Sequence, residues 1–298
     1  MKKFYLNRRW ISVILAVVIM FTGLWIDPAT VQGGESEYTI YVNITKNVVT
    51  AYKDGEPVRA MICSSGAATH ESGTFKIPNK YRWHMLNGGV CGQYCSRISS
   101  HILFHSVPLY GWQNPGSLKP SYYDKLGTKA SAGCIRLNVS DAKWIYENCP
   151  VGTQVTFYKD AEDPGPLGQP FFSKIGSFPQ PLCNWDPTDP AENSPWNVYA
   201  GDAFDADYYL ENNPDLKEMG FYWTEDSLRH HWFTNGIKEG RQASAKFSFE
   251  EFKRQRPDLY AKYGEENNYA YVEAFNTGKV SALTDSMGRR KMQGSAKK

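Results

Sequence analysis

One short segment of the chain combines the residue types of a cysteine acyl-transfer site. Cys134 follows Ser131, Ala132 and Gly133, and one candidate imidazole, His105, lies 29 positions upstream in an apolar, strand-like run. A thiolate attacks a carbonyl carbon far better than a thiol does, and a neighbouring imidazole can take up the thiol proton and stabilise the ion pair. The pattern predicts Cys134 as a nucleophile and His105 as its general base.

Three residues beside Cys134 are predicted to support this chemistry. Gly133 permits a tight turn and leaves backbone N–H groups free to point at a developing oxyanion. Ser131 can form local hydrogen bonds, and Arg136 lies on the same side of an extended chain as Cys134. The Arg136 guanidinium could hold a substrate carboxylate or form a plain surface ion pair, and the sequence favours neither.

Other side chains near this segment have less specific roles. His101 shares a strand face with His105 by the period of two and is the reserve base. Tyr122 and Tyr123 lie between His105 and Cys134 in sequence, where a lid over the substrate and packing in the core are equally open. Of the two, Tyr123 is predicted to bind substrate. Three more aromatic residues could line a cleft, although packing is the commoner use: Trp83, Tyr94 and Tyr110.

Short β-strands must position these residues. Apolar and polar residues alternate from residue 38 to 65, with a hairpin signal at Asp54-Gly55, and further strands are expected near residues 74–77, 101–107 and 155–158. Residues 81–97 are interpreted as a loop insertion. One helix is expected to begin at Ser140. The fold class is therefore a mainly β domain over residues 37–160.

The chain changes character after this domain. Residues 161–197 hold eight of the seventeen prolines and several aromatic residues, so they are expected to be a linker or, more favourably, a wrap over the first domain. Residues 198–280 contain a weak repeat in which Phe204-x4-Tyr209 matches Phe247-x4-Phe252 at an offset of 43. That period predicts a small all-α repeat module. The basic residues 281–298 are expected to be disordered.

The N-terminus indicates the compartment. Four basic residues precede an apolar run in residues 1–34, which is typical of a secretory signal peptide or a single membrane anchor, and both remain open. Export of the chain to the extracytoplasmic side is expected in either case. The net charge of +2 gives no reason to expect nucleic acid as a partner.

The chain has six cysteines, and disulfides are permitted outside the cytoplasm. Cys91 could pair with Cys95, and Cys149 with Cys183. Metal binding is a poor interpretation because no second closely spaced cysteine pair accompanies the first. No metal is therefore expected.

The motifs together resemble a known family. Phe104-His105-Ser106 followed by Ser131-Ala132-Gly133-Cys134-Ile135-Arg136-Leu137 is similar to the active-site signature of bacterial L,D-transpeptidase catalytic domains. The resemblance extends from about residue 37 to 159 and includes the Ser64-Ser65-Gly66 and Gly73-Thr74-Phe75 stretches.

The resemblance implies a β-sandwich-like domain that acts on peptidoglycan stem peptides without a cofactor. Cys134 would attack the L,D amide of a tetrapeptide stem, the terminal D-residue would leave, and an amine of an acceptor stem would resolve the thioester into a 3→3 cross-link. His105 would be the base, oriented by the main-chain carbonyl of Ser106, and the Gly133 and Cys134 amides would form the oxyanion hole. The family also implies a role in cell-wall biogenesis and cell shape, and a thiol that carbapenems acylate.

One position departs from the family pattern. Members commonly carry histidine before the glycine, where this chain has Ala132. If His105 is the base, the change removes a supporting contact, at a cost of about 1–2 kcal/mol. Three alternatives to a transpeptidase are a carboxypeptidase that hydrolyses the same acyl-enzyme, a catalytically silent wall-binding protein and a sortase-like transpeptidase. In the second, the helical module would hold a wall or protein ligand. The motif spacing fits the third less well.

Overall fold

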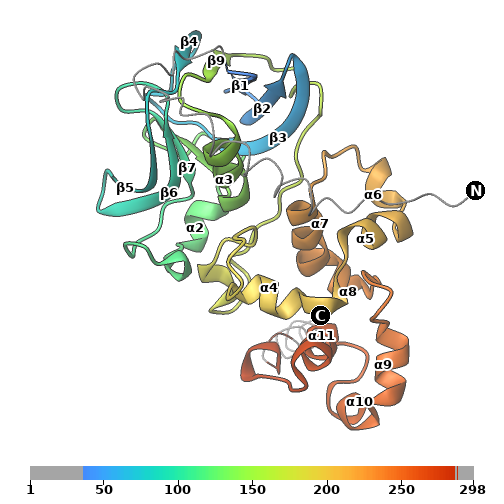
Figure 1. Ribbon diagram of the computed structural model, residues 1–298. Helices are drawn as coiled ribbons and strands as arrows, with labels where there is room; N and C mark the ends of the chain where they lie inside the picture. Colours follow the sequence, from blue (N-terminus) through green and yellow to red (C-terminus); the bar gives the residue numbers. More distant parts are fainter. Residues whose placement is uncertain (1–35, 286, 288–298) are drawn as a thin grey trace, which may run out of the picture. The chain divides into compact units, whose positions relative to one another are not determined.

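The computed structural model describes residues 36–285 and residue 287, and its first part is a single curled β-sheet (Figure 1). Nine strands lie in the order β4-β9-β1-β2-β3-β8-β7-β6-β5. They are β1 (Tyr38–Asn43), β2 (Val48–Lys53), β3 (Glu56–Ser64), β4 (Gly73–Lys76), β5 (Lys80–Leu86), β6 (Val90–Arg97), β7 (Leu103–Ser106), β8 (Ile135–Leu137) and β9 (Gln154–Tyr158). The expectation of a mainly β domain is confirmed.

Strand β3 connects the two halves of the sheet. Most of its length pairs antiparallel with β2, and its last two residues, Cys63 and Ser64, pair with β8. The alternation that predicted strands reflects which side of the sheet is buried: Ile40 and Val42 of β1 are fully buried, and Tyr41 between them is 37% exposed. Helix α3 (Val139–Asn148) packs against β6 and β7 on the core side. It begins two residues after β8 and therefore fixes where that short strand ends.

Two local predictions in this domain are wrong. Residues 81–97 are not a loop insertion, because β5 and β6 form an antiparallel hairpin there, visible as the long pair of strands in Figure 1. Helix α3 is capped by Asn138, whose side chain accepts a hydrogen bond from the Asp141 amide at 2.8 Å, and not by Ser140.

The proline-rich residues 161–197 are anchored on the sheet domain. The Asp186 carboxylate accepts a 2.9 Å hydrogen bond from the Val139 amide at the first turn of α3, and the Thr188 hydroxyl accepts one from Ser140 at 3.0 Å. Farther along, Asp124 accepts the Ile175 amide at 2.8 Å. The segment therefore wraps over the sheet domain, because these hydrogen bonds pair polar backbone groups at the start of α3 and at the segment itself.

The last part of the described chain is helical, and its helices recur at the spacing seen in the sequence. Helices α5 (Ala206–Asn212), α6 (Asp215–Glu218) and α7 (Glu225–His231) are followed by α9 (Phe249–Gln255), α10 (Pro257–Tyr263) and α11 (Asn268–Thr277). The caps repeat as well, with Asp205 and Ser248 in equivalent positions. Shorter helical elements are η1 (Pro115–Ser117), α2 (Pro120–Tyr123), η2 (Leu182–Asn184), α4 (Pro195–Ala200), η3 (Gly201–Ala203), the π-helical turn η4 (Trp232–Gly236) and α8 (Ile237–Glu239).

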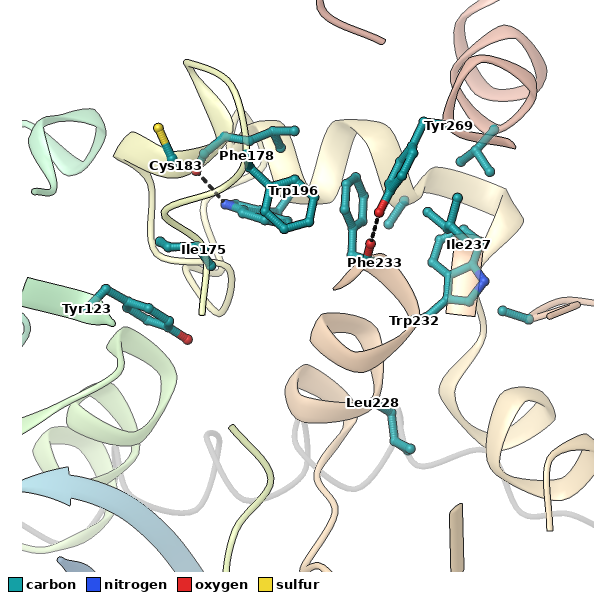
Figure 2. Packing of buried hydrophobic residues seen from close by; sticks show 14 of the residues in the cluster. Tyr123, Ile175, Phe178, Cys183, Trp196, Leu228, Trp232, Phe233, Ile237 and Tyr269 are labelled. Carbon is teal, nitrogen blue, oxygen red and sulfur yellow. Dashed lines mark hydrogen bonds between the residues drawn. The ribbon is translucent and has the colours of Figure 1, made fainter. Parts of the chain in front are cut away.

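One cluster of buried side chains runs from the sheet domain through the wrap into the helical module. It includes Leu118 and Tyr123 of the sheet domain, Trp196 of α4, and Trp232 and Tyr271 of the module. Figure 2 shows its middle, where the Trp196 indole donates to the Leu182 carbonyl at 3.0 Å and the Tyr269 hydroxyl donates to the Phe233 carbonyl at 2.6 Å. The buried polar atoms of these rings are therefore paired. A second cluster fills the interior of the curled sheet.

The N-terminal end of the chain lies outside the described residues, and the C-terminal end differs from its prediction. The proposed signal peptide or anchor, residues 1–34, lies outside them. Among the residues that the structure does describe, no helix is long and apolar enough to cross a membrane. The disordered tail was placed too early, because residues 282–285 are helical, and the Ser281 amide and the Thr284 hydroxyl both donate to the Glu273 carboxylate.

The cysteines form none of the expected disulfides. Cys91 and Cys95 lie four residues apart on the same strand, β6, which separates their Cα atoms by about 13 Å, well beyond the reach of a disulfide. Cys149 and Cys183 belong to different buried clusters. Cys134 alone of the six cysteines is not buried.

Candidate active site

The parallel pairing of β7 and β8 brings the nucleophile and base candidates to one face of the sheet. Phe104 pairs with Ile135, and His105 pairs with Arg136. By this register Leu103 lies opposite Cys134, just before β8 begins. Since side chains alternate across a strand, Leu103, His105, Cys134 and Arg136 project on the same side. Residues 29 positions apart in sequence therefore become neighbours through a two-strand ladder.

These side chains line a cleft of about 210 Å³. Its lining includes Ser131, Ala132 and Cys134 of the loop before β8, which we name the nucleophile loop after its candidate nucleophile, and also His105 and Arg136. The lining also includes Arg97, His101, Pro108 and the tip of the β5–β6 hairpin, namely residues 84–87 and Val90. The hairpin that the sequence analysis mistook for a loop is thus one side of the cleft.

The His105 imidazole is held in one orientation. Its Nδ1 lies 2.6 Å from the main-chain oxygen of Ser106. A carbonyl oxygen can only accept, so Nδ1 carries the proton and Nε2 is left with its lone pair to accept one. Ser106 is itself fixed, because its hydroxyl accepts the Gln93 amide at 3.1 Å and donates to the Val107 carbonyl at 3.1 Å. The contact expected between His105 and Ser106 is present, and the catalytic roles remain a prediction.

Burial sets the charge state of the imidazole. His105 is 2% exposed, and its pKa is lowered to about 4. Desolvation is the main cause, the Ser106 carbonyl opposes the shift, and the Arg136 guanidinium contributes to it. His105 is therefore neutral at pH 7. A neutral imidazole is the form that can accept a proton from a thiol.

The Cys134 thiol is protonated in its resting state. Burial raises its pKa, and the Leu103 backbone hydrogen bond and the positive charges of Arg136 and Arg97 only partly offset that effect. The thiol donates to the carbonyl oxygen of His101 at 3.5 Å. Proton transfer to His105 thus requires the S–H bond to turn away from His101.

A neighbouring segment, residues 65–69, clamps the nucleophile loop. The Ala68 amide donates to the Ala132 carbonyl at 2.8 Å, and the Thr69 hydroxyl donates to the Gly133 carbonyl at 2.7 Å. Within the loop, the Ser131 hydroxyl donates to the Cys134 carbonyl at 2.6 Å. Ser131 therefore acts on the loop's shape, as the prediction of local hydrogen bonding expected.

Gly66 allows this close approach. A Cβ atom at Gly66 would lie 2.5 Å from both the Gly133 nitrogen and the Ser131 carbonyl oxygen. Gly92 has a similar role beside the base, since a Cβ atom there would lie 3.1 Å from the His105 Nδ1. Neither role was predicted from the sequence. The Ser-Ser-Gly stretch was a usable signal for Gly66, whereas nothing in sequence pairs Gly92 with His105.

Arg136 and the aromatic residues of α2 can now be placed. The Arg136 guanidinium donates to the Ala130 carbonyl at 2.9 Å and lies 5.3 Å from the centre of the Tyr122 ring. Arg136 forms no salt bridge with a carboxylate within the described part of the chain. A cleft-facing cation with no anionic partner favours the interpretation of Arg136 as a carboxylate-binding residue.

The prediction of Tyr123 as a substrate-binding residue is wrong. Its side chain is 1% exposed and packs against Phe172 and His230 at ring distances of 5.5 and 6.0 Å. On the short helix α2, Tyr123 points into the core, and its neighbour Tyr122 points toward Arg136 instead.

Similarity to known proteins is found over the part of the chain that forms this site. The family model of the L,D-transpeptidase catalytic domain (YkuD) matches residues 37–157. YciB of Bacillus subtilis strain 168, named as a candidate L,D-transpeptidase, is 35% identical over 146 residues, which are 44% of this chain and 72% of that protein.

Solved structures give more distant matches. An L,D-transpeptidase from Mycobacterium smegmatis has 22% identity and a TM-score of 0.34, and the transpeptidase LdtMt1, solved in complex with imipenem, has 22% identity and a TM-score of 0.33. Each match covers 41% of this chain and 58% of the solved chain, so this chain spans little more than half of either structure.

Proposed function

Because the chain belongs to the L,D-transpeptidase family, we propose that it cross-links peptidoglycan stem peptides through a thioester on Cys134. The observation that carries the proposal is the pairing of Cys134 and His105 in one cleft, with Nδ1 of the imidazole tied to the Ser106 carbonyl. Nucleophile, base and orienting group are the three members that triad logic requires.

The proposed reaction has two steps. In the first, His105 Nε2 takes the Cys134 proton while the sulfur attacks the amide carbon of the donor stem. The Gly133 and Cys134 amides stabilise the oxyanion. The imidazolium then returns the proton to the leaving amine of the terminal D-residue, and a thioester remains. In the second step, an amine of the acceptor stem attacks the thioester carbon, gives up a proton to His105 and displaces the Cys134 thiolate. The amide bond formed between the two stems is the 3→3 cross-link.

Arg136 is proposed to hold the carboxylate of the donor stem. Its guanidinium lines the cleft two residues from Cys134, without a carboxylate partner of its own among the described residues. Ala132 is exposed at the cleft edge, and its carbonyl is already engaged by Ala68. A histidine at that position is therefore not needed to shape the loop, and we propose that the chain is active with alanine there.

The same acyl-enzyme would give an L,D-carboxypeptidase if water resolved it. We also propose that the enzyme is exported, because its substrate lies outside the cytoplasm and the first 34 residues are typical of an export signal.

The proposal is tested by incubating the purified full-length protein with imipenem and measuring its intact mass. We expect one covalent adduct on the wild type and none on Cys134→Ala. The matched control is Cys183→Ala, at a buried thiol remote from the cleft, which should still form the adduct. Absence of a wild-type adduct would contradict the proposal and favour a silent wall-binding protein. Analysis of products from stem peptides then separates 3→3 dimers from shortened monomers.

The pH dependence of acylation should reflect the buried imidazole. His105 with a pKa of about 4 stays neutral far below the range in which an ordinary histidine becomes protonated. The acid limb of the acylation rate should therefore fall near pH 4 and not near pH 6.5. At the other end, the raised pKa of Cys134 means that the rate should still be rising above pH 8 as thiolate forms. Stopped-flow acylation between about pH 3 and pH 10 measures both limbs, and an acid limb near pH 6.5 would contradict the buried base.

A further inference from the structure

The loop after β7, residues 107–118, carries aromatic side chains that packing does not explain. Trp112 is 52% exposed and Tyr110 is 51% exposed. Each is paired with another ring: Trp112 lies 6.3 Å from Trp83 of β5, and Tyr110 stacks on Tyr122 of α2 at 6.1 Å. Large aromatic rings that stay half exposed side by side mark a surface used for binding. We refer to Trp83, Tyr110, Trp112 and Tyr122 as the aromatic rim.

The loop is rigid. Its start is tied to β6, because Cys91 and Leu109 exchange two backbone hydrogen bonds of 2.8 Å. Its far end is tied back on itself, since Tyr110 donates to the Ser117 carbonyl at 3.1 Å. At the tip, a turn closed by the Asn114 amide and the Gly111 carbonyl holds Gln113 at a φ of 55°. A non-glycine residue in that conformation is strained, and the strain persists because the surrounding bonds fix the turn that presents Trp112.

The aromatic rim is continuous with the cleft on two sides. The Tyr122 ring lies beneath the Arg136 guanidinium, which lines the cleft. Met85, which also lines the cleft, is 55% exposed and lies two residues from Trp83 on the same strand face. A polymer whose side branch enters the cleft would thus pass over the aromatic rim.

The chemistry of the loop identifies the ligand. Between residues 107 and 123 there is no acidic residue, and the exposed polar side chains at the turn include the amides of Gln113 and Asn114. Three cations lie over rings of the aromatic rim: Arg82 over Trp83, Lys119 over Tyr110 and Arg136 over Tyr122. Aromatic faces beside amide groups match a neutral sugar, which has apolar C–H faces and equatorial hydroxyl and acetamido groups. An apolar protein partner would call for aliphatic side chains at the turn.

We propose that the aromatic rim binds the glycan strand of peptidoglycan, the β-1,4-linked amino-sugar chain that carries the stems. This inference rests on the proposed function, because the stem in the cleft supplies the reason for a glycan to lie here. The half-exposed rings of Trp112 and Tyr110 would stack on consecutive sugars and hold the strand while its stem reaches Cys134.

The test is a fluorescence and calorimetric titration of the full-length protein with a β-1,4-linked tetramer of N-acetylglucosamine, which has the sugar backbone and no peptide. We expect saturable binding, and dissociation constants about tenfold higher in Trp112→Ala and in Tyr110→Ala, which is the scale of one lost stacking contact. Tyr260→Ala is the matched control, since Tyr260 is 43% exposed on α10, and should bind as the wild type does. An α-1,4-linked glucose tetramer should not bind.

Three outcomes would overturn the inference: no binding of the amino-sugar tetramer by the folded wild type, equal affinity of Trp112→Ala, or a wild-type dimer that Trp112→Ala converts to monomer, which would assign the aromatic rim to a contact between copies. Thermal unfolding of each variant checks that it is folded. Imipenem labelling of the wild type does not involve the sugar. A wild type that binds the sugar but is not labelled would reject the proposed function alone. A wild type that is labelled but does not bind the sugar would reject this inference alone.

Discussion

Replacement of His105 by alanine is expected to lower the rate of Cys134 acylation by about 10² to 10⁴. His105 is the buried imidazole that lines the cleft with a fixed tautomer, so no other group takes over its proton transfer at the same geometry. The raised pKa of Cys134 makes the loss severe, because without a base the thiol contributes little thiolate at neutral pH. Stopped-flow acylation by imipenem measures the change, and the remaining rate should increase with pH as hydroxide replaces the imidazole.

The matched control is His101→Ala. His101 also lines the cleft, but its carbonyl oxygen, and not its imidazole, contacts the Cys134 thiol. The backbone contact survives the substitution, so the rate should change by less than about fivefold, within the loss of one ordinary contact. A larger loss in His101→Ala than in His105→Ala would reverse the assignment and make the reserve candidate the base.

Replacement of Gly66 by alanine should almost abolish acylation although Gly66 contacts no substrate. The added Cβ atom would lie 2.5 Å from the Gly133 nitrogen and the Ser131 carbonyl oxygen, and these are backbone atoms that cannot rotate away. The nucleophile loop must therefore shift, which moves the proposed oxyanion donors. We expect a rate loss of at least about 100-fold and a decrease of about 1–3 kcal/mol in the free energy of unfolding.

Ala67→Ser is the control for Gly66→Ala. Ala67 is the next residue and is exposed, so a hydroxyl there should alter neither quantity by much. Chemical denaturation gives the free energy of unfolding, and imipenem labelling gives the rate. Gly66→Ala with a wild-type rate would mean that the loop tolerates displacement and that its hydrogen bonds to residues 65–69 do not position Cys134.

The sequence predicted the centre of the site better than its walls. Cys134 and His105 could be paired because the residue types have a shared chemistry and a family resemblance supports the pairing. Tyr123 was assigned to the cleft and Tyr122 was left open, because a four-residue helix has no periodicity that would reveal which of two adjacent tyrosines is buried. The 81–97 hairpin was missed for a related reason: glycines and scattered aromatic residues hide strand alternation.

The helical module was predicted from a sequence repeat. This prediction is confirmed because one period of the repeat contains whole helices together with their capping residues. The offset of 43 brings Asp205 onto Ser248, and both residues cap helices. The tail was misjudged because composition averages over residues 281–298. The first few of them are held by hydrogen bonds to Glu273, and a buried carboxylate that accepts such bonds leaves no signature in local sequence.

The buried cluster that runs through both parts of the chain also limits how this protein could have been assembled or can be dissected. Leu118, Tyr123 and Leu126 of the sheet domain are buried in the same cluster as side chains of the wrap and of the module. A gene truncated after residue 160 would thus encode an enzyme with a bare apolar face, prone to self-association. The helical module is therefore better regarded as part of the same folding unit as the sheet domain than as an independent domain. Recombination could transfer it only together with a sheet domain that carries the complementary apolar face.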